Sequence, residues 1–350
     1  MFTAVMKPTV YFSPRFDASV IAALFERTLQ DGVKIGKDSR VAIKVHFGEQ
    51  GNTRFVSPRS IKPIIDSLRK INRHYFLTDA NTLYQGMRLN AADHLKIAKE
   101  HGFGSLQAEI VIADGERGKE QVEVEIGKNI FSKVKIAKAI AEADAIVAVS
   151  HFKGHMVFSF GGAIKNIGMG CGSRAGKLEM HSKIKPSVKA NCIECGQCIE
   201  QCPVGALSNE KGKTRIDQER CIGCAGCIAV CESAAVEIPW DGTTSHECVE
   251  RCVEYAFGAV KGKQCICVTF MNKITKHCDC MADSRLIGED VGIVSSVDPV
   301  ACDQAAYDLV LKKHGGMDIF MEVTGIDGRH QLAYAERIGL GMRDYSLVEI

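Results

Sequence analysis

The segments CIECGQCIEQCP (residues 192–203) and CIGCAGCIAVCE (residues 221–232) repeat one cysteine pattern, and they constrain this chain more than any other stretch. Each follows C-x2-C-x2-C-x3-C, with Pro203 closing the first run and Glu232 at the same place in the second. Three thiolates two residues apart on a tight loop can point at one face of an iron–sulfur cube. The x3 step starts a helix and turns the fourth sulfur away. The pattern therefore predicts two [4Fe–4S] clusters.

The spacing resembles that of bacterial two-cluster ferredoxins, in which the fourth cysteine of each run ligates the other cluster. The two predicted ligand sets are Cys192, Cys195, Cys198 and Cys231 for one cluster, and Cys221, Cys224, Cys227 and Cys202 for the other. Small residues between the cysteines, such as Gly196 and Gly223, let backbone amides approach the cluster sulfides, where hydrogen bonds tune the reduction potential. Zinc is the main alternative, but it usually takes isolated C-x2-C pairs rather than runs of four cysteines. Disulfides fit poorly with eight cysteines this close together.

The rest of the composition is typical of a globular protein of two or three domains, with 350 residues. Charged residues make up 25% of the chain and nearly cancel, at +2, which predicts neither nucleic-acid nor membrane binding. No apolar run approaches the roughly 18 residues of a membrane-spanning helix, and the first residues, MFTAVMKPTVYFSP, lack a secretory layout. Half of the sixteen cysteines belong to the oxygen-sensitive pattern, so we predict a reducing, anaerobic cytoplasm.

Strand-like and helix-like segments alternate on both sides of the cysteine runs. The predicted strands are 7–12, 40–47, 75–79, 109–113, 145–150, 264–270, 291–295 and 345–350. The predicted helices are 18–31, 57–71, 91–101, 134–143 and 299–313, with a charged hairpin-like stretch at 119–126. This alternation predicts an α/β fold with a doubly wound, mostly parallel sheet. Its core would comprise residues 1–185 and 241–350, interrupted by an inserted ferredoxin-like α+β module at 186–240.

A glycine-rich stretch, HFKGHMVFSFGGAIKNIGMGCGSRAGKLEMH (residues 151–181), follows the apolar strand at 145–150. It therefore lies at the carboxyl end of a strand, where α/β sheets place their ligands. We interpret it as a loop that carries the candidate catalytic residues Lys165, His155 and His181. The histidines could ligate a metal or move protons, and the lysine could neutralise an anionic substrate. An ordinary surface loop with scattered basic residues is the alternative. The stretch is not a P-loop, because Leu178 follows Gly176-Lys177 where magnesium binding needs Ser or Thr.

Two C-x-C pairs follow the cluster segment. Cys265 and Cys267 lie in an apolar strand, where they are expected to pack in the core. Cys278 and Cys280 flank an aspartate in a polar loop, so a possible third metal, a redox-active thiol pair and a structural turn are all open alternatives. The remaining cysteines of interest are Cys248 and Cys252, four residues apart on an expected helix, and Cys302, expected to be packed at the start of another.

Four motifs taken together resemble the family called domain of unknown function 362, here carrying an inserted ferredoxin module. They are KVHFGEQGN (44–52), KGH with GGAIKNIGMG (153–155 and 161–170), HCDC (277–280) and SSVDPVACDQAAYD (295–308). The resemblance covers nearly the whole chain and implies its fold and cluster content, but no particular reaction.

A more distant resemblance is to nickel-pincer lactate racemases, which carry an H-x9-K-x15-H arrangement. His155, Lys165 and His181 have that spacing, although Met169 stands where those enzymes have proline, and His94 is only a loose match to their catalytic histidines. In the racemases the lysine anchors the pincer cofactor and a histidine ligates nickel. The resemblance therefore implies a ligand pocket at these residues.

Two classes of function follow from these features. The chain could be an oxidoreductase in which cluster electrons reach a substrate or metal in the α/β pocket, supplied by an electron donor or acceptor protein. Alternatively, it could be a non-catalytic electron carrier or a metal or cofactor assembly protein. Its length favours the enzyme, because a simple carrier needs only the fifty or so residues of the module.

Overall fold

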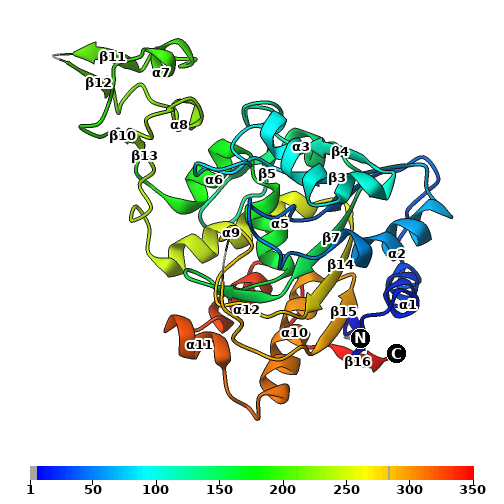
Figure 1. Cartoon of the computed structure of the whole chain (residues 1–350). Helices are drawn as coiled ribbons and strands as arrows, with labels where there is room; N and C mark the ends of the chain where they lie inside the picture. The colour runs from blue at the N-terminus through cyan, green and yellow to red at the C-terminus, as the bar shows by residue number, and fades with distance from the viewer. Residues whose placement is uncertain (1–5, 211, 283) are drawn as a thin grey trace.

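A computed structural model describes residues 6–210, 212–282 and 284–350. Its centre is an eight-stranded sheet in which seven strands run parallel and β15 alone runs the other way (Figure 1). From one edge to the other, the strands are β16 (Ser346–Glu349), β1 (Thr9–Ser13), β15 (Gly292–Ser296), β14 (Gln264–Met271), β7 (Ala145–His151), β2 (Arg40–Lys44), β3 (His74–Asp79) and β4 (Glu109–Ile112). This confirms the predicted α/β class with a mostly parallel sheet.

Helices cover both faces of the sheet and form two apolar layers. Along β2, Val41 and Ile43 face one layer and Ala42 faces the other, as the two-residue period of a strand requires. The first layer contains α1 (Ala18–Leu29), α2 (Pro58–Arg69), α3 (Ala91–Glu100) and the short helix η1 (Phe103–Leu106). The second contains α9 (Ser245–Val260), α10 (Pro299–Lys313) and α12 (Arg329–Arg337). Nearby lies α11 (Ile319–Thr324), which the sequence patterns did not predict. No helix in the described ranges is long and apolar enough to cross a membrane.

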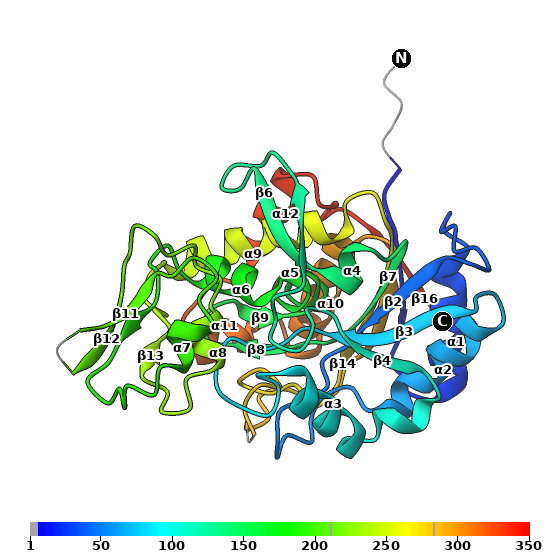
Figure 2. The same ribbon diagram turned by 90° about the horizontal axis from the view of Figure 1, so that it is seen from above.

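Strands from before and after the cysteine runs pair directly in this sheet. β7 and β14 lie parallel, with Ile146 opposite Cys265 and Ser150 opposite Thr269. The segment between them forms β10 (Ser187–Val188), α7 (Gln197–Glu200), β11 (Leu207–Glu210), β12 (Lys213–Ile216), α8 (Gly226–Ala229) and β13 (Val236–Glu237). These strands form two small two-stranded sheets. Figures 1 and 2 show the segment projecting from one side of the body.

The predicted helix at 134–143 is wrong over its first half. Residues Lys133–Ala137 form strand β6, which pairs with β5 (Gln121–Glu125), and only α4 (Lys138–Ala141) is helical. Apolar Val134 and Ile136 alternate with lysines, and both are fully buried. That two-residue period is the signal of a strand.

The glycine-rich stretch is also not one loop. It forms a hairpin of β8 (Lys153–His155) and β9 (Ser159–Gly161), followed by α5 (Ala163–Cys171) and α6 (Arg174–His181). A Cβ atom at Gly168 would come within 2.3 Å of the Cys252 carbonyl oxygen on α9. This glycine therefore permits two helices to pack closely, which a composition-based loop assignment does not anticipate.

Candidate functional site

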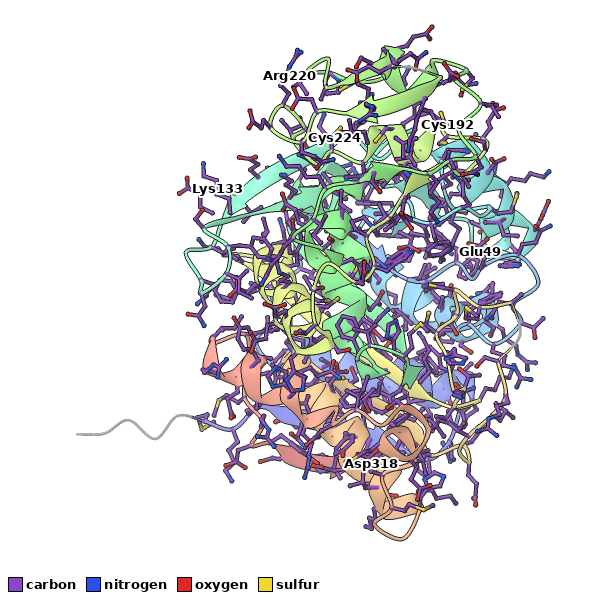
Figure 3. All side chains as sticks on the ribbon, turned by 90° about the vertical axis from the view of Figure 1, so that its left-hand side faces the viewer. Glu49, Lys133, Cys192, Arg220, Cys224 and Asp318 are labelled. Atoms are coloured by element: carbon purple, nitrogen blue, oxygen red, sulfur yellow. The ribbon has the colours of Figure 1, made fainter. Side chains whose placement is uncertain are left out.

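The eight cysteines of the two runs gather around two small cavities in the projecting segment. One cavity is lined by Cys192, Cys195, Cys198 and Cys231, and the other by Cys202, Cys221, Cys224 and Cys227. Figure 3 labels Cys192 and Cys224, which lie in this segment. The fourth cysteine of each run thus lies with the first three of the other run, and none of the eight forms a disulfide.

Backbone geometry suits these cavities to sulfur-ligated groups. The amide of Ala206 donates to Cys202 Sγ at 3.2 Å, and the amide of Ala235 donates to Cys231 Sγ at 3.2 Å. Gly196 and Gly223 adopt φ of 76° and 67°, so each run turns through left-handed backbone. Among the described residues, no three His, Cys, Asp or Glu side chains converge on a point that would hold a single metal ion.

A second polar site lies at the carboxyl edge of the sheet, where β2 ends at Lys44 and β3 ends at Asp79. The Lys44 ammonium is 3.0 Å from one Asp79 oxygen, and Arg88 Nη1 is 3.2 Å from the other. All three side chains are buried. Burial alone would raise the pKa of Asp79, but Lys44 and Arg88 outweigh it and hold this pKa well below its usual value. The site therefore carries a stable buried carboxylate between two cations.

His94, on α3, lies beside this pair. It is fully buried, and neither ring nitrogen has a hydrogen-bond partner among the described residues. Its Nε2 is 3.8 Å from Asp79 Oδ2. Burial, reinforced by Arg88, lowers the pKa of His94 well below its ordinary value despite the nearby carboxylate. The ring is therefore neutral at physiological pH, and both of its nitrogens are buried without a hydrogen-bond partner among the described residues.

The loop that carries Cys278 and Cys280 closes the site from another direction. Asp279 between them is buried, 2.9 Å from His151 Nδ1 and 2.8 Å from Lys153 Nζ. His151 ends β7 and Lys153 begins β8, so the loop is anchored to the carboxyl edge of the sheet. The sequence pattern alone left this placement open.

Cys280 differs sharply from the other cysteines outside the clusters. Its sulfur accepts a hydrogen bond from Arg88 Nη2 at 3.3 Å and lies 3.5 Å from His46 Nε2. A hydrogen bond from Cys278, together with Arg88 and His46, lowers the pKa of Cys280 well below that of a free thiol even though burial opposes this. The same hydrogen bond, followed by burial, raises the pKa of Cys278. Cys280 is therefore the cysteine of this pair that ionises more readily.

The three predicted residues, His155, Lys165 and His181, come from β8, α5 and the end of α6 rather than from one loop. They lie close enough to affect one another. Burial, followed by the charge of Lys165, lowers the pKa of His155 well below its ordinary value and that of His181 to about 4. Burial would lower the pKa of Lys165, but Cys278 and Cys280 outweigh it and raise that pKa. The lysine stays charged beside two neutral imidazoles and the thiol pair.

Most of the other cysteines are packing residues. Cys267 and Cys302 are fully buried, as expected, and Cys265 packs against the same core with its sulfur 3.9 Å from that of Cys267. Cys248 and Cys252 are buried on α9, and burial raises the pKa of each to about 12.

The connection between β3 and α3, residues 80–90, joins the two sites. Leu83 packs in one apolar cluster with Ala225 and Ile228 beside the second cysteine run. Gln85 Nε2 donates to the carbonyl of Cys231 at 3.2 Å. Arg88 of the same connection contacts Cys280. A single short segment thus touches the second cysteine run, including Cys231 of the first cavity, and the buried site.

Sequence reasoning missed four central residues of the site: Lys44, Asp79, Arg88 and His46. Lys44 and Asp79 carried a usable signal, because a charged side chain inside or ending an apolar strand marks the edge at which α/β sheets bind ligands. Arg88 lies in an irregular segment and gave no such signal, whereas His46 stood near the end of the predicted strand at 40–47 and was not singled out.

A model of the family described as "Domain of unknown function (DUF362)" matches residues 41–308. The electron transport protein HydN of Escherichia coli strain K12 is 43% identical over 64 residues, which are 18% of this chain and 37% of that protein. A ferredoxin from Pyrobaculum islandicum is 44% identical over 46 residues, 13% of this chain and 43% of that protein. The chain thus spans less than half the length of either relative.

Among solved structures, the lactate racemase apoprotein from Thermoanaerobacterium thermosaccharolyticum is similar with a TM-score of 0.34 and 18% identity. The similarity covers 64% of this chain and 48% of the racemase. A protein from Thermotoga maritima is similar with a TM-score of 0.42 and 10% identity, over 85% of this chain and 59% of that protein.

Proposed function

This chain belongs to the DUF362 family, and from that premise we propose that it is an iron–sulfur oxidoreductase. Two [4Fe–4S] clusters would occupy the two cysteine cavities. A substrate or metal would bind in the buried polar site at the carboxyl edge of the sheet, and a separate electron-transfer protein would be the redox partner.

The cluster assignment is supported by the donor set at each cavity. Cys192, Cys195, Cys198 and Cys231 would hold one cluster, and Cys202, Cys221, Cys224 and Cys227 the other. A bound [4Fe–4S] cluster takes up and releases one electron at a time. The amides of Ala206 and Ala235 would stabilise the negative charge on the ligand sulfurs of Cys202 and Cys231. The names of the relatives, an electron transport protein and a ferredoxin, agree with this assignment.

The observation that carries the oxidoreductase proposal is the double contact of residues 80–90. Gln85 hydrogen-bonds to Cys231, and Arg88, three residues further on, hydrogen-bonds to Cys280. A module that only exchanged electrons with other proteins would not need a tight connection to a buried, charged site. The connection supports electron transfer between the cysteine cavities and that site within one chain.

The site's own residues suit a small anionic substrate. Lys165 would hold the anion, since its ammonium stays charged while the adjacent histidines are neutral. His155 Nδ1 accepts the amide hydrogen of Val157 at 3.1 Å, which leaves Nε2 to carry the ring proton. That N–H would donate a hydrogen bond to the substrate and stabilise the negative charge that develops as it is reduced.

The test uses anaerobically purified protein and reduced methyl viologen as the electron source. We expect about eight irons per chain and viologen oxidation that depends on one member of a panel of small carboxylates. Lys165→Ala should abolish that oxidation while iron content and cluster absorption stay unchanged, and Lys96→Ala, an exposed lysine on α3, should behave as the wild type. Full activity of Lys165→Ala would show that the reaction occurs elsewhere, and reducible clusters with no responding compound would favour a simple carrier.

A further inference from the structure

The C-D-C turn combines features that a structural turn does not need. The amide of Met281 donates to the carbonyl of Cys278 at 3.0 Å, which closes a β-turn over residues 278–281. A turn brings residues two apart closer together than an extended strand does, within the range that a disulfide spans. The buried Asp279, held by His151 and Lys153, fixes the centre of the turn. Arg88 and His46 contact the sulfur of Cys280 at one end of this turn.

We propose that Cys278 and Cys280 form a thiol–disulfide couple and are the two-electron acceptor of the buried site. The inference rests on the proposed electron-transfer function, because the couple would receive its electrons from the clusters. A thiol–disulfide couple can store two electrons. It would therefore link clusters that deliver one electron at a time to a substrate reaction that needs two.

The reduction balances with the residues present. Two electrons, delivered one at a time by the reduced clusters, break the Cys278–Cys280 sulfur–sulfur bond. One proton goes to Cys278, and Cys280 leaves as the thiolate. The arrangement in the structure suits this product, because Arg88 Nη2 donates to Cys280 Sγ at 3.3 Å and would stabilise the thiolate. Reoxidation by a two-electron acceptor would release the same proton and restore the bond.

The surroundings favour thiol chemistry over a third metal at this loop. Arg88 directs a cationic guanidinium at the sulfur, which stabilises a thiolate and opposes an incoming metal cation. His46 Nε2 is close to Cys280, yet these groups do not form a set of three converging ligands within the described part of the chain. The path from Cys280 to a cluster cysteine is also short, since Arg88 and Gln85 belong to one connection.

The chain contains a matched internal control. Trypsin cleavage after Lys276 and Arg285 would release residues 277–285, whose only cysteines are Cys278 and Cys280. Cleavage after Lys263 and Lys273 would release residues 264–273 with Cys265 and Cys267, another C-x-C pair. That pair lies in β14, where the extended backbone holds the two Cα atoms about 6.6–7.2 Å apart, close to the usual upper limit for a disulfide, and its sulfurs are 3.9 Å apart.

The experiment equilibrates the whole protein anaerobically with either oxidised glutathione or dithionite, quenches it in acid, alkylates free thiols and measures both peptides by mass spectrometry. We expect peptide 277–285 to be unalkylated and two hydrogens lighter after oxidation, and doubly alkylated after reduction. Peptide 264–273 should be doubly alkylated in both. Double alkylation of 277–285 under both conditions overturns the proposal, as does retention of a metal at this loop.

A second measurement separates this inference from the proposed function. In a reductive titration of oxidised protein, Cys278→Ser/Cys280→Ser should accept two fewer electrons per chain than the wild type, because a disulfide takes up two. Its iron content and cluster reduction should be unchanged. Equal electron uptake by the two proteins overturns the thiol couple while leaving the clusters in place, whereas clusters that cannot be reduced in either protein contradict the proposed function itself.

Discussion

Replacing Asp79 by asparagine tests whether the buried charges at the sheet edge are organised as described. Asparagine preserves the shape of the side chain but removes the negative charge that lies 3.0 Å from Lys44 and 3.2 Å from Arg88. Removing one partner of a buried ion pair typically costs about 3–5 kcal/mol, because the remaining charge is left uncompensated. Here the cations keep other acceptors: Lys44 donates to the Asn166 side chain at 2.8 Å, and Arg88 donates to Cys280. We therefore expect a loss of about 3 kcal/mol, at the lower end of that range.

The assay is anaerobic urea unfolding followed by circular dichroism, with iron content measured in parallel. Asp66→Asn is the matched control, since Asp66 pairs with Lys62 at 2.5 Å but both side chains are exposed, at 43% and 62%. Exposed pairs contribute about 0–1 kcal/mol, so the control should barely change the free energy of unfolding. A loss below about 1 kcal/mol for Asp79→Asn would refute the view that this carboxylate compensates two buried cations. Iron content should be unchanged in both variants.

Three further predictions concern other parts of the chain. Cys231→Ala should disturb the cluster of the first cysteine run and Cys202→Ala that of the second, as read from electron paramagnetic resonance of each variant; the opposite pairing would contradict the shared cavities. Replacing residues 186–240 by a short flexible linker should leave a folded, iron-free protein by circular dichroism, because the large sheet takes no strand from them; complete unfolding with several linker lengths would argue against a modular insertion. Asp303 accepts hydrogen bonds from the amides of Ala163 and Ile164 at the start of α5, and burial raises the pKa of its carboxyl group to about 7. Between about pH 4 and pH 7 the folded protein therefore binds a proton at Asp303 that the unfolded chain has released. The wild type should therefore lose stability relative to Asp303→Asn as the pH rises from about 4 to about 7, by up to about 4 kcal/mol, and parallel stability curves would contradict this.

Sequence patterns worked well where the deciding interactions are local. The strand at 264–270 and the helix at 299–313 follow from hydrophobic period and capping residues, and the structure places them at 264–271 and 299–313. The pattern failed at β6, where Val134 and Ile136 were assigned to a helix although their alternation is that of a strand. It also failed in the glycine-rich stretch, since Gly168 serves helix–helix packing across a long separation in sequence.

The contrast between local and long-range interactions also separates the cysteine cavities from the buried site at the sheet edge. The sequence by itself predicted the two cysteine sets, from the spacing within each run and from the resemblance to two-cluster ferredoxins, in which the fourth cysteine joins the other run. It also predicted a candidate site of Lys165, His155 and His181 after a buried strand, although the three residues come from β8, α5 and α6 rather than from one loop. Only the tertiary structure decided the composition of the buried site, where Cys280 meets His46 across 234 residues of sequence. Such contacts depend on strand order, with β2 and β3 beside β7 and β14, and sheet order is set by packing of the whole chain rather than by local pattern.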